Sequence, residues 1–144
     1  MKAIRAGYTR RPWIALLLDA AAVIFFATRG RASHHLGTGI VEILLTAMPF
    51  LIALAVAWTF VGFAGQLRKV LLAPTRIWVA GVFIWVMTVF GGVAIRLMTG
   101  DTAAMPFVWV TAGLLGALFL LPRLVLHSDR AFTEWVSERD GKSA

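Results

Sequence analysis

Four long runs of residues that are almost free of charge limit how this chain can fold. The hydrocarbon core of a bilayer is about 30 Å thick, which a helix of roughly 20 apolar residues crosses. The runs are continuous rather than alternating, which favours helices over strands, because an open strand in lipid would leave backbone groups unpaired. We therefore predict four transmembrane helices, over residues 13–28, 40–65, 77–97 and 102–123.

The composition agrees with an integral membrane protein. Hydrophobic residues make up 60% of the 144 residues and charged residues 15%, whereas soluble domains are about 45–50% apolar and roughly a quarter charged. The chain also contains no cysteine. That absence excludes thiol–disulfide exchange, thiolate-bound zinc and iron–sulfur clusters as functions of this chain.

The connections between the predicted helices are short, so neighbouring helices should run antiparallel. We predict an all-α antiparallel bundle of four transmembrane helices as a single domain over residues 1–127. A charged segment, residues 128–144, follows it as a short tail. Ser128 or Asp129 could cap a short amphipathic helix there, with Phe132, Trp135 and Val136 on one face, and a disordered tail is the alternative.

Lysine and arginine counts predict the orientation of the helices, because positive residues are retained on the cytoplasmic side. If the four helices alternate in direction, 11 of the 14 basic residues lie on one side and only Arg29, Arg31 and Arg96 on the other. Both termini should therefore be cytoplasmic, in a multi-pass protein of the cell membrane. Anionic lipids explain this basic face better than nucleic acid does, so we expect the bilayer as a partner and no nucleic acid.

Three ionisable residues lie within the predicted helices: Asp19, Glu42 and Arg96. Each costs about 2.5–3.5 kcal/mol at membrane depth, so each should face the bundle and have a partner. In the predicted topology, Glu42 and Arg96 lie near the outer ends of their helices, whereas Asp19 lies in the inner half of the first. Depth therefore favours a Glu42–Arg96 pair and leaves Asp19 without an obvious partner.

Several explanations for Asp19 remain open. Its carboxylate could accept a hydrogen bond from Thr59 or another donor of the inner half, reach towards Arg123 or Arg11, or be protonated. It could also carry protons or bind a cation in a transporter.

The predicted outer surface carries a polar cluster of Arg29, Arg31, His34 and His35. Adjacent histidines point in different directions, so an exposed loop explains them better than a metal site. Haem held by two histidines is disfavoured, because His127 lies at the opposite membrane face. We expect no metal and no cofactor.

Small and aromatic residues mark the helix faces that should pack together. In the third helix, one such face contains Gly81, Trp85, Thr88, Gly92 and Arg96. The corresponding residues of the fourth helix are Pro106, Trp109, Gly113 and Gly116 or Ala117. Trp13, Trp58 and Trp78 lie near the predicted cytoplasmic interface and are typical of an aromatic belt, whereas Trp85 and Trp109 lie deeper, where packing explains them.

Several short segments resemble a family of small bacterial membrane proteins of unknown function. The segments include 18–20 and 30–34, Pro49-Phe50 and Trp58, then Pro74-Thr75, 85–88, Gly91-Gly92, Arg96 and Phe107. The resemblance covers residues 14–123. It implies a four-helix membrane protein, often encountered in actinobacteria, and no activity or catalytic residue, because the family is uncharacterised.

The sequence supports three functional hypotheses. Small-residue faces, short loops and the lack of a catalytic set favour an accessory or scaffold subunit of a larger membrane complex, or a homo-oligomer. Asp19 in the first of four helices is similar to the acid of small multidrug exporters, although their weak charge bias differs from this chain. A membrane enzyme acting on a lipid-linked substrate through Asp19 or the outer cluster has the least support, so no catalytic residue is assigned.

Overall fold

The computed structural model describes residues 12–33, 37, 39–63 and 77–141, with side chains described between Trp13 and Leu124 except in the gaps and at Ile77 and Trp78. The described elements are four helices: α2 (Pro12–Ser33), α3 (Ile40–Phe63), α5 (Ile77–Met98) and α6 (Met105–Gly141). The expectation of an all-α fold with four helices is confirmed. By length and composition all four can cross a membrane, which supports a multi-pass membrane protein.

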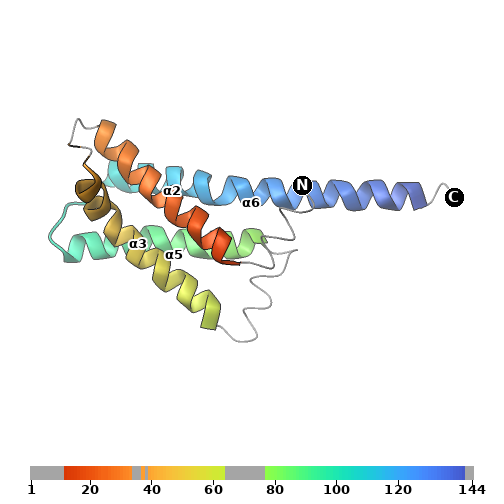
Figure 1. Ribbon diagram of the computed structural model, residues 1–144, viewed down its shortest axis with the longest axis horizontal. Helices are drawn as coiled ribbons and strands as arrows, with labels where there is room; N and C mark the ends of the chain where they lie inside the picture. The colour runs from red at the N-terminus through yellow and green to blue at the C-terminus, as the bar shows by residue number, and fades with distance from the viewer. Residues whose placement is uncertain (1–11, 34–36, 38, 64–76, 142–144) are drawn as a thin grey trace.

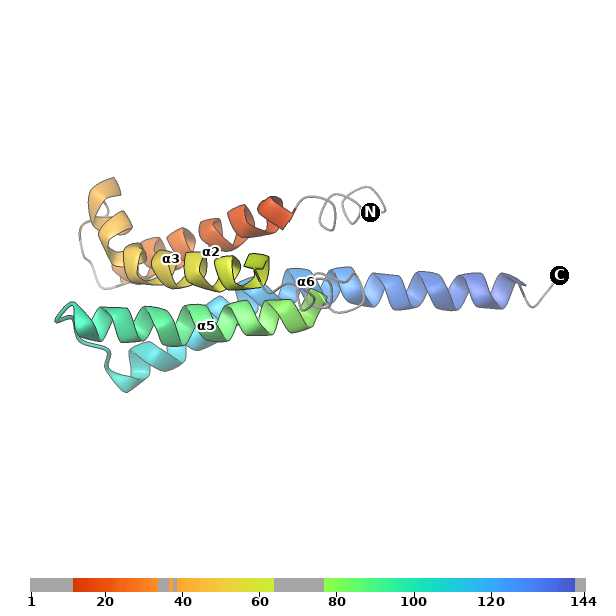
Figure 2. The ribbon, with the colours of Figure 1, turned by 90° about the horizontal axis from the view of Figure 1, so that it is seen from below.

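The four described helices lie side by side. Figure 1 shows the last residues of α2, the first residues of α3 and the α5–α6 turn together at one end of the bundle, here named the hairpin end. At the opposite end, here named the exit end, α6 extends past the other described helices (Figures 1 and 2). α2 packs against α3 and α6, and α5 packs against the same two helices from the other side.

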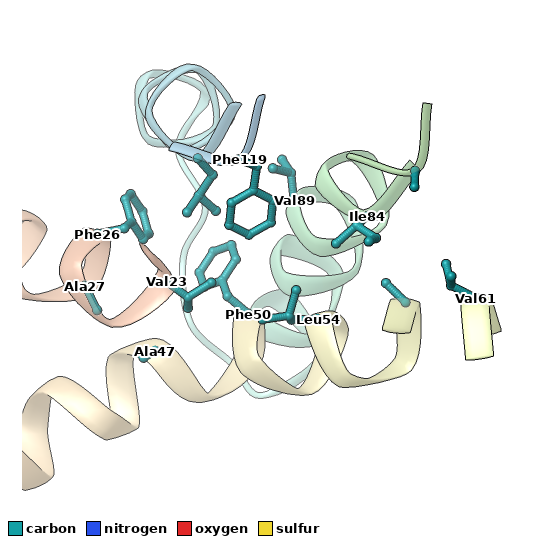
Figure 3. Close-up of a cluster of buried hydrophobic side chains, with 13 residues drawn as sticks. Val23, Phe26, Ala27, Ala47, Phe50, Leu54, Val61, Ile84, Val89 and Phe119 are labelled. Carbon is teal, nitrogen blue, oxygen red and sulfur yellow. The ribbon is translucent and has the colours of Figure 1, made fainter. Parts of the chain in front are cut away.

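Large apolar side chains from all four helices fill the space between them. Val23, Phe50, Leu54, Ile84 and Phe119 are all at least 99% buried, and Figure 3 shows them converging from different helices. Nearer the hairpin end, the rings of Phe26, Phe50 and Phe107 pack with centroids 5.6–6.3 Å apart. Close side-chain packing of this kind holds membrane helices together. Lipid tails are as apolar as these side chains, so the hydrophobic effect does not drive the helices into contact.

Glycines allow close approach on the predicted inner face of α5. A Cβ at Gly92 would overlap the ring of Phe50, so only glycine fits against this phenylalanine. Trp85 packs on Gly116 of α6 and donates a hydrogen bond from Nε1 to the Ala112 carbonyl at 3.0 Å. The small-residue face of α5 therefore does pack against its neighbours.

The predicted packed face of α6 is wrong except at Gly116, which is buried. Pro106, Trp109 and Gly113 are exposed, and Trp109 keeps 71% of its surface accessible. The buried stripe instead contains Thr111, Leu115, Phe119 and Arg123, at intervals of four residues. Small residues indicate the packed face in α5, whereas in α6 large side chains fill most of the packed face.

The outer surface of the bundle is apolar. Exposed large hydrophobic residues occur on every helix, and they include Leu17, Ile52, Phe60, Phe90 and Val110. A water-soluble bundle would place polar residues there. The exposed apolar faces are those expected of helices that contact lipid.

α6 is much longer than the predicted fourth span. Its 37 residues measure about 55 Å at 1.5 Å per residue, and its apolar membrane-length part is the 20 residues Met105–Leu124. The helix passes Ser128 and Asp129 without a break, so the expectation of a new short helix capped there is wrong. The remaining 17 residues project from the exit end (Figure 2).

Candidate functional site

A buried ion pair joins Asp19 of α2 to Arg123 of α6. Nη1 of the guanidinium donates to Oδ1 at 2.9 Å and Nη2 donates to Oδ2 at 2.7 Å, so the contact is bidentate. The side chains of Asp19 and Arg123 are only 4% and 5% exposed. The planar guanidinium of Arg123 matches the two carboxylate oxygens of Asp19, and the two opposite charges compensate each other in this buried position.

α3 contributes a third member of this site. The indole Nε1 of Trp58 donates to Oδ2 of Asp19 at 3.0 Å. Three donors therefore face the carboxylate, which has about four lone-pair sites. Asp19 thus orders α2, α3 and α6 around one polar centre.

α5 contributes space rather than a polar group. A Cβ added at Gly81 would overlap Cδ of Arg123. The Arg123 side chain therefore packs against α5 at the position where glycine leaves space for it. Nη1 of Arg123 also donates to the Phe119 carbonyl at 2.7 Å, and the guanidinium lies 5.9 Å from the Phe119 ring centroid. We name Asp19, Trp58, Gly81 and Arg123 the polar node, to which each of the four helices contributes one residue.

The positions of these residues along their helices explain why they meet. Asp19 is the eighth residue of α2 and Gly81 the fifth of α5, while Trp58 and Arg123 are each the nineteenth residue of their helices. Since α2 and α5 begin at the exit end and α3 and α6 begin at the hairpin end, all four positions fall in the exit-end half. The node therefore lies inside the membrane-length part of the bundle, towards the exit end.

A half-open groove lies beside the node, between α2 and α6. Its volume is about 390 Å³, and its lining is almost entirely apolar, with Asp19 and Arg123 forming part of the wall. The remaining lining residues are Ala15, Leu18, Ala21, Ala22 and Phe25 of α2, and Leu118 and Pro122 of α6.

The structure selects one of the alternatives left open for Asp19. Its partner is Arg123, the second donor is Trp58, and Thr59 instead donates to the Ala55 carbonyl of its own helix at 2.7 Å. The sequence predicts Trp58 only as a belt residue and gives no contact between Trp58 and Asp19. The available signal was its depth, because Trp58 of α3 lies at about the level of Asp19.

The expected Glu42–Arg96 pair is wrong. Glu42 pairs with Arg31 at 3.4 Å, and Arg96 lies 3.9 Å from Asp101. Both acids are about half exposed, at 51% and 55% of their side-chain surface. Glu42 and Arg96 each have an oppositely charged partner close to them in the sequence, so neither needs the other as a partner.

Arg31 organises the connection between α2 and α3. Its Nε donates to the Gly37 carbonyl at 2.6 Å, and its Nη1 donates to the Thr46 hydroxyl at 3.0 Å. Glu42 accepts a hydrogen bond from the Gly39 backbone N–H at 3.2 Å, as the third helical residue does in a capping box. The spacing Gly39-x-x-Glu42 is the sequence signal for this role, and the depth of Glu42 in its helix does not reveal it.

Arg96 has the equivalent role in the α5–α6 turn. Its Nε donates to the Thr102 carbonyl at 3.1 Å, and its guanidinium stacks 5.1 Å from the Phe107 ring centroid. Gly100 makes this tight turn with a φ of 86°, which favours glycine.

The remaining members of the predicted outer cluster do not form a site within the described residues. Arg29 is exposed, and His34 and His35 lie outside the described residues. Among the side chains that the structure describes, no group of three histidine or acidic residues has a geometry that could hold a metal ion.

Comparison with known proteins supplies a family but no activity. No curated protein and no solved structure matches the sequence. Residues 16–126 match the family described as "Protein of unknown function (DUF3054)", and this range includes all four members of the polar node. The matched range covers more than half of the chain, so this protein belongs to the DUF3054 family of unknown function.

Proposed function

We propose that this protein is an accessory or scaffold subunit of a complex in the cell membrane. In this arrangement the helices form an antiparallel bundle, both termini are cytoplasmic, and the exit end faces the cytoplasm. The excess of basic residues before α2, between α3 and α5, and from Arg123 of α6 onward supports this orientation. The bundle serves as a rigid base, since the polar node ties its helices together.

The continuous α6 is the observation that carries the proposal. Beyond Leu124 its last 17 residues extend about 25 Å, past the ends of the other described helices. An isolated helix of this length is only marginally stable in water. The sequence also predicts an apolar face there, so a partner that covers this helix would both stabilise it and be recruited to the membrane.

The test is the composition of the native complex. The protein, tagged and expressed at its natural level, is solubilised together with surrounding lipid in a membrane-extracting polymer, and its mass and stoichiometric partners are measured. We expect an assembly with a defined second subunit, and a Phe132→Ser, Trp135→Ser variant that reaches the membrane without it. A monomer in every preparation would contradict the scaffold role.

Transport coupled to protons or cations through Asp19 is the alternative, and the groove beside Asp19 is the observation in its favour. The bidentate contact with Arg123 counts against it, because a coupling acid has to exchange its partner during each cycle. Uptake of a tracer cation, or proton flux, into proteoliposomes tests this function. Activity that disappears in Asp19→Asn while the fold persists would favour transport over the scaffold.

A further inference from the structure

We propose that residues 40–48, the first part of α3, bind the surface of the bilayer at the hairpin end and lie along it instead of crossing the hydrocarbon core. This inference depends on the bundle spanning a bilayer and not on the scaffold role. Figure 2 shows that the beginning of α3 runs across the long axis of the bundle, after which the helix turns and runs beside α5. In a bundle that spans a bilayer along this axis, residues 40–48 are therefore directed along the membrane surface.

A proline accounts for the change of direction. Pro49 lies in the interior of α3 and is buried. A proline inside a helix kinks it and removes the N–H that would donate to the carbonyl four residues earlier, here that of Leu45. In hydrocarbon such a carbonyl has to find another protein donor, whereas water reaches it at the surface of the bilayer. The kink therefore favours a position of residues 40–48 at the boundary between lipid and water.

Residues 40–48 separate into an apolar and a polar face. The polar face contains Glu42 and Thr46, and the guanidinium of Arg31 donates to both, at 3.4 Å and 3.0 Å. The opposite face is exposed and consists of large apolar residues, which are Ile40, Val41, Leu44, Leu45 and Met48. A helix with two such faces lies in the membrane interface, with its apolar face towards the acyl chains and its polar face towards the headgroups.

The depth of the kink agrees with the boundary of the hydrocarbon core. Phe50, the residue after the proline, packs its ring against that of Phe26 in α2, with centroids 5.6 Å apart. Three residues further along α2, or about 4.5 Å towards the hairpin end, lies the exposed Arg29. Because charged side chains are costly in hydrocarbon, the core ends close to the depth of Pro49, and residues 40–48 lie at its boundary.

A lipid surface fits the exposed face of residues 40–48 better than a partner helix does. Nine residues of helix extend about 14 Å, whereas a partner's transmembrane helix packs along a span of about 30 Å. The exposed face carries no charged residue that would select a protein partner. It also adjoins the exposed apolar residues of α3 beyond the kink, such as Ile52 and Val56, which contact lipid in a spanning bundle.

Spin labels at single cysteines measure the depth of residues 40–48. The chain contains no cysteine, so each variant of the full-length protein carries one nitroxide. In phosphatidylcholine vesicles, the accessibility of the label to oxygen and to a water-soluble nickel chelate reports its depth. Labels at Ile40→Cys, Leu44→Cys and Met48→Cys should all lie within about 5–10 Å of the headgroups and differ in depth by less than about 4 Å.

The part of α3 beyond the kink provides the matched control. Ile52 and Val56 are also exposed and are also four residues apart. Because that part of the helix crosses the membrane, the label at Val56→Cys should lie about 6 Å deeper than the label at Ile52→Cys. All five labels replace exposed side chains, and thermal unfolding verifies that each labelled variant folds.

Three results would overturn the proposal. Depth that increases by about 6 Å for every four residues from Ile40 to Met48 would show that α3 crosses the membrane from its first residue. Labels at these positions that only the nickel chelate reaches would place residues 40–48 in water. Labels that neither reagent reaches would identify a second protein molecule as the occupant of the exposed face. None of these results bears on the projecting part of α6, so the scaffold role is judged separately.

Discussion

The two ends of the bundle both contain ion pairs, but they are built in different ways. At the exit end, Asp19 and Arg123 are 104 residues apart in the chain and almost fully buried. At the hairpin end, Arg31 and Glu42 are 11 residues apart, and half of the Glu42 side chain is exposed. The distant pair determines which helices are neighbours, whereas the local pair fixes the geometry of one connection.

Because the two ion pairs differ in burial, the loss of a charged partner should cost different amounts of unfolding free energy at the two ends. A buried charge that loses its partner is costly, typically about 3–5 kcal/mol, because it is neither solvated nor compensated. An exposed pair contributes only about 0–1 kcal/mol, since solvent screens it. The following substitutions test that difference, from the largest expected effect to the smallest.

Removing Arg123 should give the largest loss of stability. Arg123→Met leaves the buried Asp19 carboxylate without its bidentate partner, and we expect the unfolding free energy to fall by about 3–5 kcal/mol. Chemical unfolding in detergent micelles, followed by circular dichroism, measures the change. The double variant Asp19→Leu, Arg123→Met removes both charges and should recover most of the stability. A double variant less stable than Arg123→Met would contradict this account.

Trp58→Phe should have the second largest effect. The substitution keeps an aromatic ring but removes the Nε1 hydrogen bond to Asp19, and a bond to a charged group contributes about 1.5–3 kcal/mol. The same unfolding measurement applies. In the Asp19→Leu, Arg123→Met background the bond is already absent, so Trp58→Phe should cost clearly less there. Equal losses in both backgrounds would show that Trp58 acts through packing alone.

Gly81→Ala tests the space through which Arg123 crosses α5. The added methyl group overlaps Cδ of Arg123, and we expect a loss of about 1–3 kcal/mol from overpacking. Gly113→Ala is the matched control, because nothing lies within 4 Å of a Cβ at that position. In the control, the better helix propensity of alanine should stabilise α6 by up to about 1 kcal/mol. Thermal unfolding should therefore show a lower stability for Gly81→Ala and a higher stability for Gly113→Ala.

Glu42→Gln should have the smallest effect. Glutamine retains the hydrogen bond to the Gly39 N–H but removes the charge that pairs with Arg31, so we expect a loss of less than about 1 kcal/mol. The loss should shrink further in 1 M salt, where exposed charges are screened. A salt-independent loss as large as that of Arg123→Met would show that the two ends do not differ as described.

The described helices were largely predictable from hydropathy, whereas the pairing of charges was not. Depth along each helix correctly placed Asp19 far from Arg96, but depth alone does not say which of several basic residues a carboxylate meets. Arg123 was counted among the interfacial charges because it ends an apolar run. Only the lateral packing of α2 against α6 directs its side chain inward to Asp19.

At the hairpin end, by contrast, the sequence contains local signals for the contacts that form. The local signals for its contacts, Gly39-x-x-Glu42 and the Arg96–Asp101 spacing, are present in the sequence, and depth in the membrane does not indicate them. In α6, the small residues Gly113 and Gly116 indicated a packed face, and only Gly116 is buried. Small residues permit close approach without requiring it, so they did not identify the packed face.

The sequence alone determined that this chain forms four helices long and apolar enough to cross a bilayer, because hydrocarbon excludes both charges and unpaired backbone groups. It also identified Asp19 as the residue in need of a partner. Only the tertiary structure decided that Arg123, Trp58 and the open space at Gly81 satisfy that need. The reason is physical: the period of a helix fixes which residues share its face, whereas the packing of four helices decides which faces meet.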